Sequence, residues 1–199
     1  MQGDGKLSST NRGYDRHKSD YYITPVSRVQ EFLNEFIKHE PDAFNGHVVD
    51  PSSGGDQNHP MSYPTAISNL NLNGGGITTI DIREDSLAEI KNNYLSVELP
   101  IKPKIIISNP PFNLSEEIIE KSLNDVEDGG FVVMLLRLNF FEGKKRKEGF
   151  WRRVGLPKYS FVHHRRMSFT DDGKTDSVAY QHIVFQKGYN PEFTLLKVI

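Results

Sequence analysis

Apolar side chains recur at helical spacing in the segment that follows the first twenty residues. The repeating positions are Val29, Phe32, Leu33, Phe36 and Ile37. Residues three and four apart share one face of a helix, so these five form an apolar stripe. Thr24 supplies a capping hydroxyl, and Pro25 suits the first helical position. The pattern predicts an amphipathic helix that ends near His39.

Short apolar runs then alternate with helical stretches through the middle of the chain. The runs are HVVD at 47–50, GGITTID at 75–81, KIII at 104–107 and FVVMLLRL at 131–138. After the second run, Leu87, Ile90 and Tyr94 fall on one helical face, and a helix is expected from about Ser115 after the third. Strands that are apolar on both faces and alternate with helices are typical of a parallel sheet in an α/β domain.

The last part of the chain follows another plan. YSFVHHR (159–165) and AYQHIVFQK (179–187) are separated by a segment that includes the turn-rich DDGKTD (171–176). Strands joined in this way are expected to be antiparallel neighbours at the end of the sheet. Residues 1–20 are polar and without periodicity, which predicts a flexible N-terminal tail. Residues 21–199 are expected to form a single domain, with no internal repeat.

Composition narrows the class of protein. The chain has 199 residues, no cysteine and a formal net charge of −2. This length can bury one substantial core, and the lack of cysteine excludes disulfides and thiolate metal sites. No apolar run approaches the roughly 18 residues of a membrane helix, and the N-terminus carries no apolar signal segment. We therefore expect a soluble cytoplasmic protein without a membrane partner, and its charge gives no general attraction to nucleic acid.

Unusual polar residues fall where the predicted strands end. They are Asp50, Asp81, Asn109 and Asn139. In open α/β sheets, ligands bind beyond the carboxyl ends of the strands, where loops from several strands converge. The pattern therefore predicts that one crevice collects these side chains.

The first two strand ends suggest a nucleoside-bearing ligand without a pyrophosphate. Asp50 opens a loop, PSSGGD (51–56), whose glycines let backbone amides approach a ligand. The loop has neither the Gly-Lys-Ser/Thr of a phosphate loop nor the spacing of a dinucleotide site. Asp81 is placed to accept hydrogen bonds from ribose hydroxyls. The competing interpretations are a common turn at the loop and a helix-capping or solvated acid at Asp81.

The third strand end, Asn109-Pro110-Pro111-Phe112, is more specific. Its two prolines fix the backbone and remove two N–H donors, so the loop presents acceptors. The Asn109 oxygen and the Pro110 carbonyl suit the two hydrogens of an NH2 group, and Phe112 offers a face for stacking. An amine held in this way can pyramidalise and attack an electrophile. The alternative is an ordinary strand-ending turn with Phe112 in the core.

These motifs together resemble the S-adenosylmethionine-dependent N6-adenine DNA methyltransferases, and small phage or prophage members in particular. The family hallmark Asp/Asn-Pro-Pro-Tyr/Phe stands here at 109–112. YYITP (21–25) is similar to the N-terminal cofactor motif and VVDPSSGGD (48–56) to the glycine-loop motif, while Asp81 matches the ribose-binding acid. The resemblance implies a Rossmann-like class I methyltransferase fold, with a mostly parallel seven-stranded sheet, an antiparallel last strand and helices on both faces. It implies S-adenosylmethionine as the cofactor, bound by Tyr22, Thr24, Pro25, Asp50, Pro51, Ser52, Gly54 and Asp81.

Three features depart from the family pattern. QNHPMSYP (57–64) replaces a smooth helix start after the glycine loop. Residues 92–99 offer no acid at the expected place after the third strand, only Asn93, Tyr94 and Glu98. There is no separate target-recognition domain, so sequence choice is expected from loops, from a homodimer or from an accessory partner.

A basic segment, GKKRKEGFWRR (143–153), mixes cations with aromatic rings and suggests contacts with DNA. The candidate nucleic-acid-binding residues are Lys144, Lys145, Arg146, Lys147, Trp151, Arg152, Arg165 and Arg166. The competing interpretation is a solvated helix face that Trp151 anchors to the core. The histidines lack ligand spacing, and no metal site is predicted.

Three functions are consistent with the sequence. The first is N6-adenine methylation of DNA, in host cytoplasm if the gene belongs to a phage. The second is the same chemistry on guanine N2 of RNA or on a protein glutamine. The third is an inactive methyltransferase-like binding protein, which the irregular glycine loop favours and the intact 109–112 motif opposes.

Overall fold

The computed structural model of the chain describes residues 22–169, 175 and 177–199. Within them the strands are β1 (Val48–Asp50), β2 (Ile77–Asp81), β3 (Ile90–Lys91), β4 (Ile105–Ser108), β5 (Phe131–Arg137), β6 (Tyr159–Val162), β7 (Tyr180–Gln186) and β8 (Leu195–Val198). The helices are α1 (Val26–His39), α2 (Ser62–Asn69), α3 (Ser115–Asp125), α4 (Lys144–Glu148) and α5 (Phe150–Val154). Short 3-10 turns are η1 (Tyr94–Ser96), η2 (Phe112–Leu114) and η3 (Leu138–Phe141). The tail expected at 1–20 lies outside the described residues.

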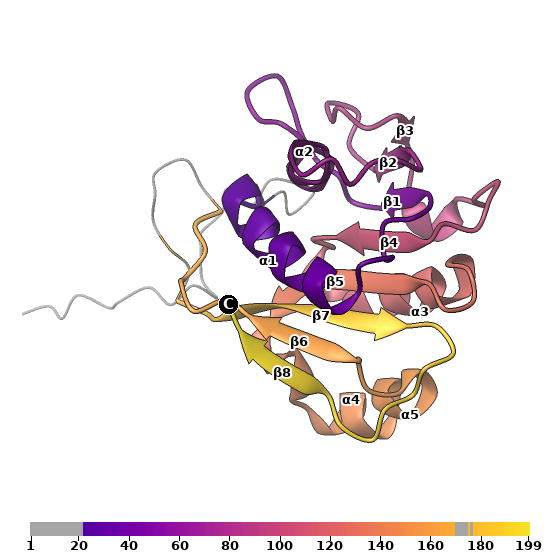
Figure 1. Cartoon of the computed structure of the whole chain (residues 1–199), viewed down its shortest axis with the longest axis vertical. Coiled ribbons are helices and arrows are strands. Elements are labelled where there is room, and N and C mark those ends of the chain that lie inside the picture. Colours follow the sequence, from indigo (N-terminus) through magenta and orange to yellow (C-terminus); the bar gives the residue numbers. More distant parts are fainter. Residues whose placement is uncertain (1–21, 170–174, 176) are drawn as a thin grey trace, which may run out of the picture.

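The strands of the described chain form one sheet in the order β3-β2-β1-β4-β5-β7-β6-β8 (Figure 1). β1 to β5 are parallel, β7 runs antiparallel to both β5 and β6, and β8 is parallel to β6. This confirms the mostly parallel α/β sheet and the antiparallel pairing of β6 with β7. The expected seven strands are joined by an eighth, β8, which pairs with β6 at the edge of the sheet.

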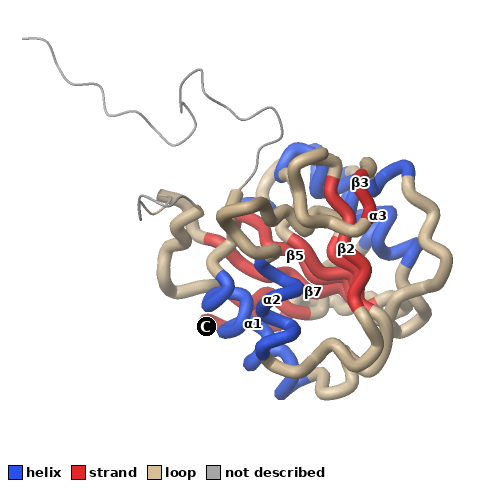
Figure 2. The backbone as a smooth tube through the Cα atoms, turned by 90° about the horizontal axis from the view of Figure 1, so that it is seen from above, coloured by secondary structure: helices blue, strands red, loops and turns tan. Residues whose placement is uncertain are grey.

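Helices cover both faces of the sheet (Figures 1 and 2). Alternation along β4 directs Ile105 and Ile107 toward the core that includes residues of α1 and α2, and Ile106 toward the core that includes residues of α3 and α5. All three isoleucines are fully buried. The apolar run at 105–107 therefore reflects a strand covered on both faces, as predicted.

The expectation for the start of α1 was wrong. α1 ends at His39 as predicted, but Pro25 occupies its N-cap position and no side chain caps it. The Thr24 hydroxyl instead accepts a hydrogen bond from Asn109 Nδ2 at 3.0 Å.

The helix expected around Leu87 and Tyr94 is absent from the described chain, which forms turns, β3 and η1 there. Short polar side chains explain this difference. Ser86 Oγ donates to the Arg83 carbonyl, and Asn93 Oδ1 accepts from the Leu95 N–H. Such local bonds stabilise turns at the expense of a helix.

One carboxyl group lies inside the sheet core. Asp50, at the end of β1, is fully buried, and its Oδ1 accepts hydrogen bonds from Ser108 Oγ at 2.6 Å and from the Ser52 N–H at 3.2 Å. Its Oδ2 has no hydrogen-bond partner among the described residues. Burial raises the pKa of Asp50 to about 7, although the Ser108 bond acts in the opposite direction. Asp50 thus joins β1 to β4 and fixes the first residues of the glycine loop.

The raised pKa predicts a stability difference between the wild type and Asp50→Asn. The unfolded chain releases this proton near pH ~4 and the folded chain near pH 7, so the folded state holds an extra proton between these values. The wild-type free energy of unfolding should therefore fall, relative to the variant, by on the order of 1–3 kcal/mol between pH 5 and pH 8. Urea unfolding of both proteins at the two pH values measures this shift.

The comparison with the variant removes the contribution of the buried histidines. Burial lowers the pKa of His163 to about 4 and also lowers the pKa of His182. These two histidines make the free energy of unfolding rise with pH, but they do so equally in the wild type and in the variant. Asp128→Asn, at an acid whose side chain is 95% exposed, is the matched control. A difference between wild type and Asp50→Asn that stays the same at both pH values would contradict the assignment.

Candidate functional site

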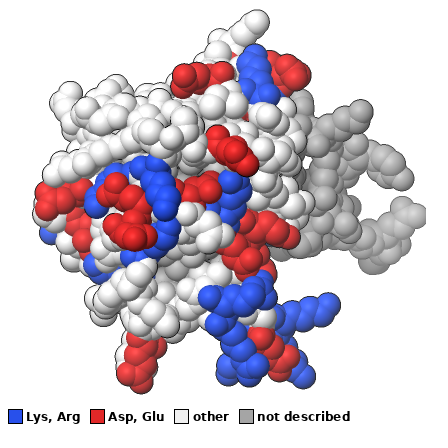
Figure 3. Space-filling view, turned by 90° about the vertical axis from the view of Figure 1, so that its right-hand side faces the viewer, with Lys and Arg blue, Asp and Glu red and all other residues white. Residues whose placement is uncertain are grey.

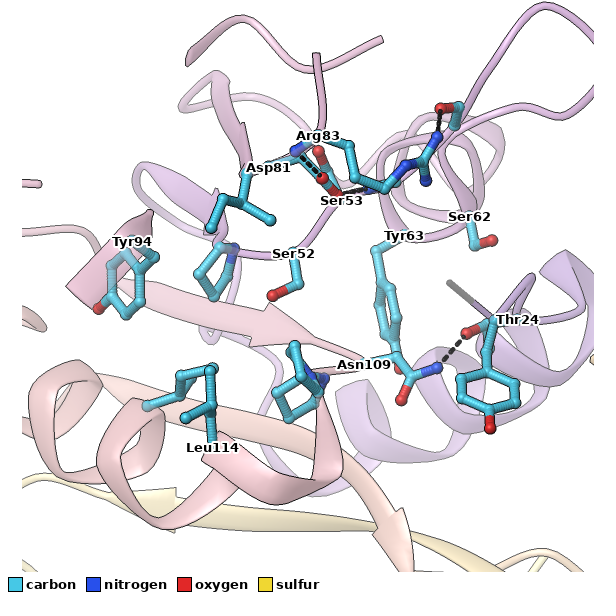
Figure 4. A pocket seen from close by; sticks show the side chains of 18 of the residues that line it. Thr24, Ser52, Ser53, Ser62, Tyr63, Asp81, Arg83, Tyr94, Asn109 and Leu114 are labelled. Carbon is cyan, nitrogen blue, oxygen red and sulfur yellow. Dashed lines mark hydrogen bonds between the residues drawn. The ribbon is translucent and has the colours of Figure 1, made fainter. Parts of the chain in front are cut away.

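A crevice opens beyond the carboxyl ends of β1, β2 and β4 (Figure 4). Its lining includes Tyr22 and Thr24 before α1, residues 51–55 of the glycine loop, Ser62 and Tyr63 of α2, Asp81 to Arg83, Asn93, Tyr94, and Asn109 to Pro111. Of the four side chains predicted to meet in one crevice, Asp81 and Asn109 line it, while the Asp50 strand end contributes only the loop that follows it. Asn139 does not line the crevice. Pro25 and Asp50 also lie outside the lining, since Pro25 precedes α1 and Asp50 is buried beneath the loop.

The glycine loop and Asp81 hold each other in place. Gly54 and Gly55 have φ angles of 63° and 74°, which favour glycine over any other residue. The Gly54 N–H donates to Asp81 Oδ2 and the Arg83 N–H donates to Asp81 Oδ1, both at 2.8 Å. A carboxylate oxygen can accept a second hydrogen bond, so Asp81 keeps acceptor capacity toward the crevice.

The chain makes an extra turn between the glycine loop and α2. Asp56 Oδ1 accepts hydrogen bonds from the N–H groups of Asn58 and His59, and α2 begins only at Ser62. The loop closes tightly, because a Cβ on Gly55 would lie 2.7 Å from Met61 Cγ. The irregular helix start noted in the sequence is thus an ordered turn that leaves the crevice open.

Beyond β3 the crevice is lined by uncharged residues. Asn93 caps η1, and the Tyr94 hydroxyl donates to Asp125 Oδ2 at 2.8 Å, while burial raises the pKa of Tyr94. Asp81 is the only acid among the described residues that line the crevice. Glu98 does not line the crevice, whereas Asn93 and Tyr94 do.

Asn109 presents an unused acceptor at the crevice. Its Nδ2 donates to Thr24 Oγ1, which fixes the amide plane across 85 residues of sequence. Its Oδ1 is buried and has no hydrogen-bond partner among the described residues. Figure 4 shows the Asn109–Thr24 pair at one end of the crevice and Asp81 with Arg83 at the other. Pro110 and Pro111 form the wall next to Asn109.

Phe112 lies beside the crevice but is not part of its lining. Its ring centroid is 6.1 Å from that of Tyr22 and 6.0 Å from that of Tyr180, and the side chain packs against both core clusters. The ring is therefore both a core contact, as in the alternative interpretation, and a neighbour of Asn109.

Sequence reasoning missed Arg137, whose guanidinium Cζ lies 5.0 Å from the centre of the Phe112 ring. Arg137 is the only charged residue of β5, FVVMLLR, and stands at its carboxyl end. A single charge at the end of a strand that is otherwise apolar on both faces was the signal that could have identified it.

The basic segment is partly used by the fold itself. Arg146 donates to Glu116 and to the carbonyls of Phe140 and Glu142, each at 2.8 Å. The Trp151 ring stacks on Phe141 with a centroid distance of 5.5 Å, which supports the anchoring interpretation.

The other cations of the candidate nucleic-acid set are exposed. They are Lys144, Lys145 and Lys147 on α4, Arg152 on α5, and Arg165 and Arg166 after β6. Arg152 lines a second groove with Lys187 and Tyr189. The face seen in Figure 3 carries acids beside most of its cations. None of these exposed cations is among the described residues that line the crevice.

Two further properties concern only the described residues. None of their helices has the length and apolar character needed to cross a membrane. Among the same residues, no three His, Cys, Asp or Glu side chains form a group that could hold a metal ion.

Comparison with solved structures places this arrangement among known folds. A proposed class I S-adenosylmethionine-dependent methyltransferase from Listeria monocytogenes has a TM-score of 0.65 at 13% identity, over 93% of this chain and 68% of that one. A proposed RNA methyltransferase from Pyrococcus horikoshii has a TM-score of 0.63 at 14% identity, over 88% and 93%. The M protein of the type I restriction enzyme EcoKI has a TM-score of 0.57 at 15% identity, over 88% of this chain and 47% of the M protein.

Sequence comparison gives no match, either to a protein-family model or to a curated protein. At 13–15% identity the structural likeness concerns the fold. The chain has the Rossmann-like α/β fold of class I methyltransferases.

Proposed function

We propose that this protein is an S-adenosylmethionine-dependent methyltransferase that methylates the exocyclic N6 amine of adenine in DNA. The observation that carries the proposal is the buried Asn109 Oδ1, which has no hydrogen-bond partner among the described residues and borders the crevice. A buried acceptor without a donor is costly, so a ligand N–H at this position is its natural partner. The two prolines that follow Asn109 supply carbonyls and no N–H, which suits an amine rather than an anion.

The lining of the crevice carries groups that suit the cofactor. The crevice opens beyond the carboxyl ends of the strands, where ligands bind in open α/β sheets. Asp81 has lone pairs left for ribose hydroxyls, and the positive φ of Gly54 brings backbone close to the crevice. Bound S-adenosylmethionine would supply a methyl group on a sulfonium centre.

The remaining cofactor residues fall into two groups. Tyr22, Thr24, Pro51 and Ser52 would line the bound molecule. Pro25 and Asp50 would not touch the bound molecule. Pro25 would position the start of α1, and Asp50 would hold the glycine loop through the Ser52 N–H.

The chain's own residues would contribute mainly positioning. Asn109 Oδ1 would accept one amine hydrogen and the Pro110 carbonyl the other, so that the nitrogen lone pair points at the methyl carbon. Phe112 would stack on the extrahelical base. The nitrogen loses its proton only after it has become positively charged, so no strong base is required.

The substrate class is the less constrained part of the proposal. Phosphate contacts would come from the exposed cations on α4 and α5 and from Arg165 and Arg166 after β6. Residues 21–199 would form a single catalytic domain, and loops, a homodimer or an accessory subunit would supply sequence choice.

Calorimetric titration with S-adenosylmethionine tests the cofactor site. We expect micromolar binding by the wild type and at least tenfold weaker binding by Asp81→Asn, because the amide that replaces the carboxylate keeps its shape but removes one acceptor oxygen. Asp128→Asn, at an exposed acid, is the matched control and should bind as the wild type. Absence of wild-type binding, with or without DNA, would contradict the methyltransferase proposal and favour an inactive binding protein.

Asn109→Ala tests the amine holder. Its contact is made with the reacting nitrogen, so kcat should fall by roughly 100-fold or more while the Kd for S-adenosylmethionine changes less than about threefold. Asn69→Ala, at an exposed asparagine at the end of α2, provides the control. Equal losses in kcat and in cofactor affinity would assign Asn109 to the cofactor site instead.

A competition assay decides the substrate class. Tritiated S-adenosylmethionine is offered with equal masses of unmethylated DNA, ribosomal RNA and total protein, and the labelled product is digested and identified by mass spectrometry. We expect label in DNA as N6-methyladenine. Label in guanine N2 of RNA or in protein glutamine would support methyl transfer to an amine or amide but would contradict DNA as the substrate.

A further inference from the structure

Arg137 stands at the carboxyl end of β5, over the ring of Phe112, the last residue of the 109–112 motif. It pairs with Tyr180 of β7, whose ring is one of the neighbours of Phe112. Alternation along β5 puts Arg137 on the same face as Val133 and Leu135, which belong to the core beneath α1. The other six residues of β5 are apolar and buried. The guanidinium of Arg137 therefore lies at the boundary between the apolar core of the sheet and the carboxyl ends of the strands.

Arg137 is half-buried, and one nitrogen of its guanidinium is buried without a partner. Its Cζ lies 5.0 Å from the Phe112 ring centre, and its Nε has no hydrogen-bond partner among the described residues. A contact with the face of an aromatic ring offsets part of the cost of burying the charge but does not satisfy the Nε–H. Buried donors without partners are rare in folded proteins, and each calls for an explanation such as a functional role.

One unused acceptor and one unused donor thus belong to residues close to Phe112, although Arg137 itself is not among the residues that line the crevice. The acceptor is Asn109 Oδ1, three residues before Phe112, and the donor is Arg137 Nε–H, over its ring. The N6 amine of adenine has the complementary pattern, because N1 and N7 on either side of it are both acceptors. A ring that stacks on the face held by Arg137 would displace the guanidinium toward the edge of that ring, where these nitrogens lie.

We propose that Arg137 donates an N–H to the ring nitrogen beside the reacting amine and thereby selects the target base. This inference rests on the function proposed above. It makes Arg137 a specificity-determining residue that acts on the substrate directly. A base that carries an N–H beside its amine, as guanine does at N1, would place that donor against the Arg137 N–H donor and would be rejected.

The test uses substrates that lack one acceptor atom. One DNA fragment is amplified with either adenine or 7-deazaadenine throughout, and a synthetic strand is made with either adenine or 1-deazaadenine. Every adenine is replaced at once, so the test does not depend on the target sequence. Methyl transfer is measured as kcat/KM for the wild type, Arg137→Met and Arg137→Lys. Arg28→Met removes an arginine that pairs with Glu31 on α1 and serves as the control.

We expect the wild type to lose roughly tenfold or more on one of the two analogues, since a polar site rejects a substrate that lacks its partner atom. Arg137→Met should lose a comparable factor on adenine and nothing further on that analogue. Arg137→Lys should recover part of the discrimination, and Arg28→Met should behave as the wild type.

Two results would overturn the inference without touching the proposed function. One is full wild-type activity on both analogues, which needs no variant to fold. The other is equal loss by Arg137→Met on adenine and on both analogues, which would assign Arg137 to supporting Phe112 alone. If the wild type methylates no adenine DNA, the proposed function fails and this inference fails with it.

Discussion

The neighbouring positions of β1 and β4 at the centre of the sheet are the constraint on which the site depends. The chain places β2 and β3 on one side of β1 and then crosses to β4 and β5 on the other, so the strand order reverses between β1 and β4. Loops that leave two such strands diverge and open a crevice between them. The Ser108–Asp50 hydrogen bond joins the last residues of these two strands in the buried core. It fixes the separation of the glycine loop from the Asn109 segment.

The walls of the crevice are held by polar bonds between segments that are distant in sequence. Asp81 uses one lone pair on each oxygen for the backbone of Gly54 and Arg83, and Thr24 orients the Asn109 amide from the start of α1. Two of the buried polar atoms without hydrogen-bond partners among the described residues are Asn109 Oδ1 and Arg137 Nε. Asn109 precedes Phe112 by three residues, and the Arg137 guanidinium lies over the Phe112 ring. Pre-organised polar groups of this kind lose little entropy when a ligand completes them, which is the arrangement that catalysis by positioning requires.

Charge contributes less to the site than the composition of the basic segment suggests. Arg146 and Trp151 hold α4 and α5 onto α3, η3 and β7 through Glu116, Phe140 and Phe185. The exposed lysines of α4 lie on the same helix as Glu148. Arg165 and Arg166 belong to a different segment, after β6. Surface cations dispersed among acids favour weak, salt-sensitive contacts over a preformed binding groove.

The sequence by itself determined the elements whose signal is local and repetitive. The stripe from Val29 to Ile37, the isoleucines of β4 and the restricted motif at 109–112 act through periodicity and through the fixed geometry of proline, which neighbouring segments do not change. The same strand-end logic identified the crevice, because carboxyl ends of parallel strands must meet at one edge. Tertiary structure decided what depends on a partner far along the chain. Thr24 bonds to Asn109 instead of capping α1, Asp50 lies beneath the loop instead of in the crevice, and Arg137 contacts Phe112 from the next strand. A side chain that can satisfy several partners is assigned to one only when packing brings that partner within hydrogen-bonding or van der Waals distance, and no local pattern carries that information.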